Sequence, residues 1–235
     1  MANSASVFHY DQPRLDNDVV ALEPFDPSVH LSQSVKRFRE HPEILAYMAF
    51  PPLDDEDVFV RTAWEHIRSS PADCLFAVRD KAAVLPGAQE DAPVAGFVTL
   101  SSTNPMNATT ELGIVLFPEF HHTHVATNAV GLILEWLLDP PSAGGLGLRR
   151  VEWKTHADNA SARQFAAHIG FELEGICRWE RVVQPGKPGA PVVALQTRNG
   201  TDMELLGLHT AVYSIVWDEW DVKRPNVVAQ MERKR

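Results

Sequence analysis

Hydrophobic residues in the first half of the chain form short continuous runs and two stretches with helical spacing. Short apolar runs bounded by turn residues are typical of buried strands. We expect such strands at 19–22, 75–78, 94–100 and 111–117. The helical spacing predicts helices at 28–39 and 54–69, which the Pro51-Pro52 pair separates. Turns join the last three strands, so these should pair antiparallel.

In the second half of the chain the hydrophobic period changes to that of an amphipathic helix. Val125, Ala129, Ile133 and Trp136 lie on one face of the segment 123–138. Further elements are expected as a strand at 149–155, a helix at 159–169 and strands at 171–183 and 211–216. The pattern predicts an α/β (α+β) domain with a mixed, mostly antiparallel sheet of about seven strands and about four helices. Its central strand–helix–strand unit should contain a parallel pair and a ligand crevice.

The boundaries of the domain follow from where this pattern stops. We expect residues 1–18 to form an N-terminal arm, 19–221 a single domain and 222–235 a polar C-terminal tail. Glycine and proline are frequent in 184–207, which predicts a long irregular loop inserted in the domain.

Composition narrows the classes of partner. The chain has 235 residues, and 21 Lys+Arg against 31 Asp+Glu give a net charge of −10, the wrong sign for binding nucleic acid. Neither an apolar run long enough to span a membrane nor a secretory signal is evident, so no membrane partner is expected. The 2 cysteines fit a reducing compartment such as the cytoplasm and have no zinc spacing.

The junction 117–127 is the first candidate site. A strand ends at Pro118, and a short loop enters the amphipathic helix, whose free amides and dipole suit a diphosphate. Every strand-to-helix loop offers such amides. Geometry alone therefore leaves open whether this junction binds a phosphate or is an ordinary loop. His121, His122 and His124 also suggest a metal, but Glu119 is the only carboxylate nearby in the sequence, and we expect no metal.

Several motifs in this region resemble the GNAT acetyltransferase superfamily. They are Glu-Leu-Gly-Ile-Val-Leu-Phe-Pro at 111–118, the helix opening at 125–129, the segment 145–155, Asp158-Asn159 and Ile-Gly-Phe-Glu-Leu-Glu-Gly at 169–175. They are most similar to the branch that contains the ribosomal-protein alanine N-acetyltransferases. The resemblance implies a sheet splayed at its central parallel pair. It also implies that acetyl-CoA binds in the gap as co-substrate and that a primary amine accepts the acetyl group.

The resemblance also implies which residues bind the cofactor. Backbone groups of Val115, Leu116 and Phe117 would pair with the pantetheine arm. The loop amides of His122, Thr123, His124, Val125, Ala126 and Thr127 would hold the pyrophosphate. Asn159 would contact the cofactor from the other wall, although asparagine is also a favoured helix N-cap, and Arg163 is a candidate for the phosphates. Two positions depart from the family pattern: His124 replaces a glycine, and Ala162 replaces a serine.

Acetyl transfer to an amine needs a proton acceptor, a donor to the oxyanion and a route for the thiolate to leave. Glu111 is the candidate base, by resemblance to members that use a glutamate on this strand; the alternative is a solvated carboxylate at the strand edge. Tyr213 and Ser214 are candidate acids or substrate contacts on the last strand, where Tyr213 is equally typical of a core residue. His156 is a further acid–base candidate, or else a turn residue.

These observations predict an acetyl-CoA-dependent N-acetyltransferase in which the amine attacks directly within a ternary complex. No cysteine or serine motif indicates a covalent intermediate, and Cys177 is more typical of a core residue than of an acyl carrier. We expect the acceptor to be a small amine or amino acid, a metabolite or a xenobiotic, and the protein to be a monomer or homodimer. The alternatives are a protein N-terminal acetyltransferase and a non-catalytic acyl-CoA-binding module, the latter because of His124 and Ala162.

Overall fold

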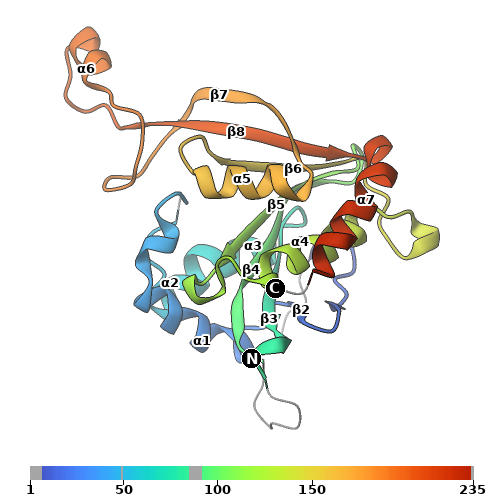
Figure 1. Cartoon of the computed structure of the whole chain (residues 1–235). Coiled ribbons are helices and arrows are strands. Elements are labelled where there is room, and N and C mark those ends of the chain that lie inside the picture. Colours follow the sequence, from blue (N-terminus) through green and yellow to red (C-terminus); the bar gives the residue numbers. More distant parts are fainter. Residues whose placement is uncertain (1–6, 49, 85–91, 234–235) are drawn as a thin grey trace.

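A single twisted sheet forms the centre of the molecule (Figure 1). The computed structural model describes residues 7–48, 50–84 and 92–233. In order of pairing, the strands in these ranges are β1 (Leu15–Asp16), β2 (Val20–Pro24), β3 (Cys74–Asp80), β4 (Val94–Asn104), β5 (Thr109–Leu116), β6 (Arg150–His156), β8 (Gly207–Val216) and β7 (Glu172–Val182). β3, β4 and β5 pair antiparallel, and β5 with β6 is the parallel pair, both as expected. The predicted mixed α/β fold is therefore confirmed.

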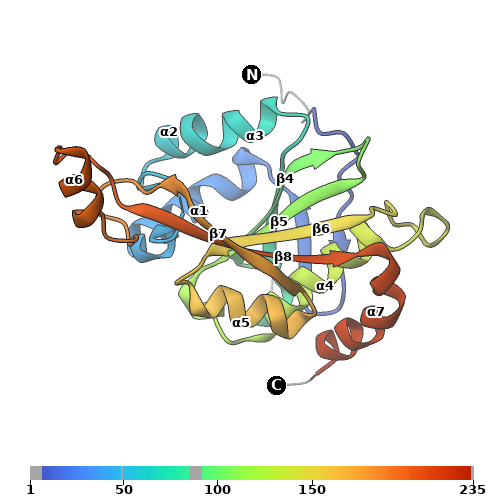
Figure 2. The ribbon, with the colours of Figure 1, turned by 90° about the horizontal axis from the view of Figure 1, so that it is seen from above.

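The helices cover the two faces of the sheet (Figure 2). On one face lie α1 (Pro27–Glu40) and a continuous helical stretch made of α2 (Glu56–Phe59), a π-helical turn (Val60–Trp64) and α3 (Glu65–Ser69). On the other face lie α4 (His124–Leu138), α5 (Ala160–Ile169) and α7 (Trp217–Met231). Short 3₁₀ turns occupy Pro42–Leu45, Lys81–Ala83, Pro118–Phe120 and Pro141–Ala143. No helix in the described ranges is long and apolar enough to cross a membrane.

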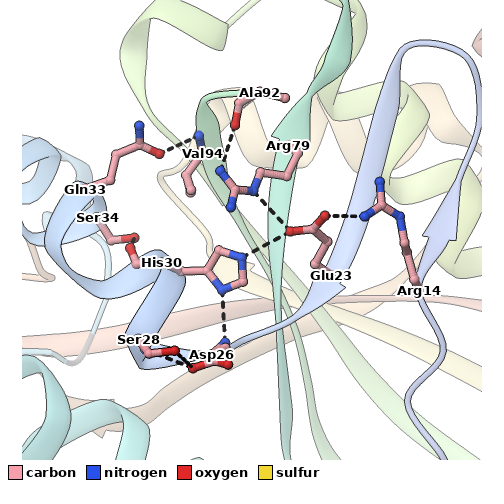
Figure 3. Close-up of polar contacts among 10 residues, drawn as sticks. All are labelled: Arg14, Glu23, Asp26, Ser28, His30, Gln33, Ser34, Arg79, Ala92 and Val94. Carbon is pink, nitrogen blue, oxygen red and sulfur yellow. Dashed lines mark hydrogen bonds and ion pairs between the residues drawn. The ribbon is translucent and has the colours of Figure 1, made fainter. Parts of the chain in front are cut away.

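A buried polar cluster fixes α1 to β2 and β3 (Figure 3). The Glu23 carboxylate accepts hydrogen bonds from Arg79 Nε at 3.1 Å and from His30 Nε2 at 3.2 Å, and it also pairs with Arg14. The other ring nitrogen of His30 accepts from the amide of Asp26 at 2.9 Å. The proton of the imidazole therefore lies on Nε2, where it is shared with Glu23. Glu23, Arg79 and His30 lie on β2, β3 and α1, so the cluster joins these three elements.

The expected polar tail at 222–235 is instead mostly helix. α7 runs to Met231 and packs on α4, with Trp220 and Val227 fully buried. Trp220 Nε1 donates to Asp139 at the end of α4 at 2.6 Å. The helix passes so close to α4 that a Cβ at Gly131 would lie 2.2 Å from the sulfur of Met231. The sequence pattern does not predict this helix, because its buried apolar residues Trp220 and Val227 are two helical turns apart with charged residues between them.

The insertion at 184–207 is also more ordered than a loop. It contains α6 (Val193–Asn199), at the far end of the β7–β8 pair in Figure 1. β8 begins at Gly207, four residues before the expected start at 211. The predicted N-terminal arm contributes β1, which pairs antiparallel with β2. The turn expected after β3, at 81–93, lies partly outside the described residues.

Candidate functional site

The parallel strands β5 and β6 separate shortly after they meet. Their pairing covers Thr109–Glu111 with Arg150–Glu152, and within the described residues it goes no further. Beyond that point β5 stays paired to β4 and β6 stays paired to β8. The last five residues of β5 and the last four of β6 therefore form the two walls of a V-shaped opening.

Only alternate residues of β5 direct their backbone groups into this opening. The amide of Phe117 donates to Ala95 on β4 at 2.9 Å. The carbonyl of Val115 also faces β4, since a Cβ at Gly96 would lie 2.0 Å from it. Because successive residues of a strand alternate in direction, Ile114 and Leu116 face the opening. The predicted roles of Val115 and Phe117 are thereby corrected; of the three residues, Leu116 alone faces a ligand in the gap.

The loop before α4 presents backbone amides at the wide end of the opening. Thr123 is the N-cap, and its hydroxyl accepts from the amide of Val125 at 3.3 Å. The amides of Thr123, His124, Val125 and Ala126 have no partner one turn earlier in the helix. The amide of Thr127 is the first to bond within the helix, to the carbonyl of the N-cap. The predicted phosphate-binding amides are thus present at 123–126, whereas Thr127 is a buried residue of the first turn.

The three histidines of this loop point to different partners. His121 Nε2 lies 2.9 Å from the carbonyl of Leu116, the strand-end group that faces the opening. His124 Nε2 lies 3.1 Å from Oδ1 of Asp80 at the end of β3. His122 has a left-handed backbone with φ of 58°. No group of three His, Cys, Asp or Glu side chains placed to hold a metal occurs in the part of the chain that the structure describes.

The candidates on α5 are engaged in local contacts. Asn159 is the N-cap, and its side-chain oxygen accepts from the amide of Ala162 at 3.1 Å. Arg163 donates to the hydroxyl of Tyr213 at 3.1 Å and to the carbonyl of Ala157 at 2.9 Å. Tyr213 is buried on the face that α5 covers. These contacts favour structural roles for all three side chains over the predicted roles in binding and catalysis.

Glu111 lies on the opposite face of the sheet, within a chain of ion pairs. Lys154 Nζ lies 3.1 Å from Glu111 and 2.9 Å from Glu152. Burial disfavours the ammonium, but hydrogen bonds to Glu152 and Glu111 hold the pKa of Lys154 above its ordinary value. The candidate base therefore already has a cationic partner within hydrogen-bond distance.

Ser214 lies at the far end of the same chain of charges. Its hydroxyl donates to Glu174 at 2.7 Å, and Arg150 holds that carboxylate with both terminal nitrogens. The hydrogen bonds from Arg150 and Ser214 lower the pKa of Glu174 to about 2. Since Tyr213 and Ser214 are successive strand residues, their side chains point to opposite faces. The structure therefore does not bring Tyr213 and Ser214 together with Glu111 into one catalytic group.

A cavity of about 130 Å³ lies beside the opening, on the face of the sheet that Glu111 occupies. Glu111 and the segment 154–156 form its floor. The turn 46–48 and the segment 181–184, with Lys187, enclose its sides. Segments far apart in the sequence thus meet at the point where β5 and β6 have just separated.

Lys187 fastens two of these walls together. Its ammonium donates to the carbonyls of Leu45, Met48 and Phe50 at 2.6, 2.6 and 2.7 Å. Burial of the ammonium lowers the pKa of Lys187. Sequence reasoning missed this lysine, because its partners are backbone groups more than a hundred residues earlier.

His156 ends β6 and lines the same cavity. Its side chain is buried, with the Tyr47 ring centred 5.2 Å from the imidazole. Nδ1 accepts from the amide of Asp158 at 3.1 Å. Nε2 is buried and has no hydrogen-bond partner among the described residues. The alternative prediction of a turn residue is therefore wrong, because His156 is the last strand residue and its ring faces inward.

Cys177 is an exposed residue of β7, so the expectation of a core cysteine is wrong. The register of β7 and β8 is interrupted between Cys177 and Arg181, where Trp179 has a left-handed backbone with φ of 58°. This irregularity removes the regular inward and outward alternation on which the expectation depended. Cys74, in contrast, is buried in β3.

The fold and the split between the strands are those of a known class of enzyme. A family model described as an acetyltransferase (GNAT) domain matches residues 20–172 of the 235. The chain therefore belongs to the GNAT acetyltransferase family and is an acyltransferase. No sequence among the curated proteins matches it.

Solved structures of acetyltransferases share this fold. A GCN5-related N-acetyltransferase from Brucella melitensis is 24% identical over 95% of this chain and 87% of its own, with a TM-score of 0.74. The microcin C7 self-immunity acetyltransferase MccE, solved with acetyl-CoA and AMP, is 16% identical over 85% and 93%, with a TM-score of 0.61. The ribosomal-protein-S5-alanine acetyltransferase from Vibrio fischeri is 13% identical over 89% and 99%, with a TM-score of 0.62. At these identities the likeness supports the fold, and the narrower resemblance to the ribosomal-protein branch stays a prediction.

Proposed function

We propose that the protein transfers an acetyl group from acetyl-CoA to a primary amine by direct attack in a ternary complex. The observation that carries the proposal is the divergence of β5 and β6 after Glu111 and Glu152. It leaves an open strand edge on β5 beside the first backbone amides of α4, which have no partner one turn earlier in the helix. An extended ligand that ends in a diphosphate fits this combination, and members of the GNAT family use acetyl-CoA.

The residues present provide for each part of such a cofactor. Backbone groups of Ile114 and Leu116 face the opening and would pair with the pantetheine arm as a neighbouring strand does. The amides of residues 123–126 would hold the pyrophosphate, helped by the positive end of the helix dipole. The imidazole of His121 already donates to the carbonyl of Leu116 and would compete with the cofactor for that acceptor.

The amine enters, in this proposal, from the cavity above the opening. Glu111 lies in its floor, paired with Lys154, and takes up the amine proton through water. The amine nitrogen forms a bond to the acyl carbon, the electron pair of the C–S bond passes to sulfur, and the thiolate leaves. The cavity of about 130 Å³ favours a small amine or amino acid over a folded protein terminus.

Calorimetric titration with acetyl-CoA tests the first half of this proposal. We expect saturable binding at micromolar concentration, and no heat up to millimolar ligand would reject it. Release of free thiol with a panel of primary amines tests the second half. Binding with no thiol release from any amine would favour the alternative of a non-catalytic acyl-CoA-binding module.

The role of Glu111 is tested by Glu111→Gln. We expect turnover to fall on the order of 10²-fold, as for loss of a general base, with nearly unchanged affinity for acetyl-CoA. Glu43→Gln is the matched control, since Glu43 is an exposed carboxylate on a turn outside the cavity. Equal turnover in Glu111→Gln and wild type would remove Glu111 from the mechanism.

A further inference from the structure

The hydrogen bonds around His156 determine where its proton lies. The amide of Asp158 can only donate, so Nδ1, at 3.1 Å from it, must be the unprotonated nitrogen. The carboxylate of Asp158 lies 3.9 Å from Nδ1, too far for a hydrogen bond, and is largely exposed. The ring is therefore neutral with its proton on Nε2, which is the buried nitrogen without a partner among the described residues.

An unpaired donor at this depth needs an explanation. A buried hydrogen-bonding group without a partner costs about 1–3 kcal/mol of stability. The surrounding fold satisfies Nδ1 and packs Tyr47 against the ring, so the imidazole is held in place. Trp153 Nε1 and Gln230 Oε1 are also buried without a partner among the described residues, but of these three residues His156 alone lines the cavity, where a ligand can reach it.

The register of the parallel pair places His156 relative to the opening. Glu111 and Glu152 are the last paired residues. Val115 and His156 each stand four residues beyond these on their own strands. The next residue of β5, Leu116, directs its amide into the gap, and His156 lines the cavity that lies beside this gap.

We propose that the Nε2–H of His156 donates a hydrogen bond to the carbonyl oxygen of an acyl-CoA thioester held between β5 and β6. The inference rests on the proposed function and adds to it an oxyanion donor from β6. When the amine attacks, the electron pair of the carbonyl moves to oxygen, and the hydrogen bonds of His156 and of the Leu116 amide strengthen. The proton stays on Nε2 throughout, so His156 is neither a base nor an acid. A neutral imidazole is an established kind of electrophilic catalyst.

Infrared difference spectroscopy with acetyl-CoA labelled with ¹³C at the carbonyl tests the proposal without knowledge of the acceptor. A hydrogen bond lowers the stretching frequency of the thioester carbonyl. We expect a lowered frequency in the wild type, a higher one in His156→Phe, and partial recovery in His156→Gln, whose amide can donate from a similar position. Tyr47→Phe is the control, since it keeps the ring that contacts His156.

Calorimetry on the same samples separates the two proposals. Absence of acetyl-CoA binding to the wild type would overturn the proposed function and this inference with it. Binding with the same carbonyl frequency in wild type and His156→Phe would overturn the inference alone. With an amine that supports turnover, we expect kcat to fall about 10²-fold in His156→Phe, as for loss of one oxyanion donor, with little change in KM for acetyl-CoA.

A measurement on the wild type keeps the test valid if His156→Phe does not fold. The ¹⁵N and ¹H resonances of the imidazole report the tautomer directly. We expect a single proton, on Nε2, whose resonance moves downfield with acetyl-CoA and much less with CoA, which lacks the carbonyl. A proton on Nδ1, or equal responses to the two ligands, would refute the assignment.

Discussion

Removal of the Lys187 ammonium should open the cavity while leaving the sheet intact. In Lys187→Met the carbonyls of Leu45, Met48 and Phe50 lose their common donor. A hydrogen bond to a charged group is worth about 1.5–3 kcal/mol. Water can replace part of this, since the lysine is not fully buried and its three partners share one ammonium.

We therefore expect a loss of about 2–3 kcal/mol in the docking of the two segments, rather than the sum of three bonds. With tenfold for each 1.4 kcal/mol, the undocked population rises about 30- to 140-fold. Backbone hydrogen exchange should increase by that factor in 45–48 and 183–187. In contrast, β3, β4 and β5 should keep their protection, because their hydrogen bonds do not involve Lys187.

Among the kinetic constants, we expect the KM for the amine to change, because the cavity walls move while the opening between β5 and β6 does not. Lys36→Met, at an exposed position of α1, is the control for loss of one positive charge. Lys187→Arg should recover little, because a planar guanidinium cannot reproduce three donors from one nitrogen. Unchanged exchange at 45–48 in Lys187→Met would refute the reasoning.

Two further perturbations concern histidines with defined partners. His121→Ala should tighten acetyl-CoA binding about 2- to 10-fold, because the imidazole that competes for the Leu116 carbonyl is gone; weaker binding by calorimetry would show that His121 instead holds the cofactor. Burial lowers the pKa of His30, and the nearby Arg79 acts in the same direction, against the hydrogen bond that the imidazole donates to Glu23. The unfolded chain thus binds this proton first, and stability should fall as pH drops below about 6.5. His30→Gln should flatten that fall in urea unfolding at pH 5 and 7.5, and an equal fall in both proteins would contradict it.

The sequence patterns located most of the elements that build the opening. Continuous apolar runs identified β3 and β4, because a strand buried on both faces leaves no alternation to interpret. An apolar run also located β5, although its residues alternate between buried and partly buried. The periodic face of α4 and the asparagine N-cap of α5 were equally clear. α7 was missed because Trp220 and Val227 are its main apolar contacts and Pro225 interrupts the pattern. In that segment, packing against α4 outweighs local preference.

The contacts that assign roles to side chains were beyond sequence reasoning. His124 pairs with Asp80 and Lys187 with Leu45, and nothing local to either residue specifies the partner. The same holds for Tyr213, whose hydroxyl meets Arg163 because β8 lies under α5. Such pairs depend on the order of strands in the sheet. The position of β8 between β6 and β7 is determined by tertiary packing, which local sequence patterns do not specify.

The strand separation has a chemical consequence that neither strand could produce alone. The backbone groups of a paired strand form hydrogen bonds to the neighbouring strand. An open edge in the middle of a sheet is therefore a row of unused donors and acceptors. On β5 the row includes the amide of Leu116, and the facing strand contributes the Nε2–H of His156 instead of a backbone group. An oxygen atom between the walls can accept from both, whereas closed strands would leave no room for it. The same divergence that admits an extended ligand therefore also creates the place where negative charge on its carbonyl can be stabilised.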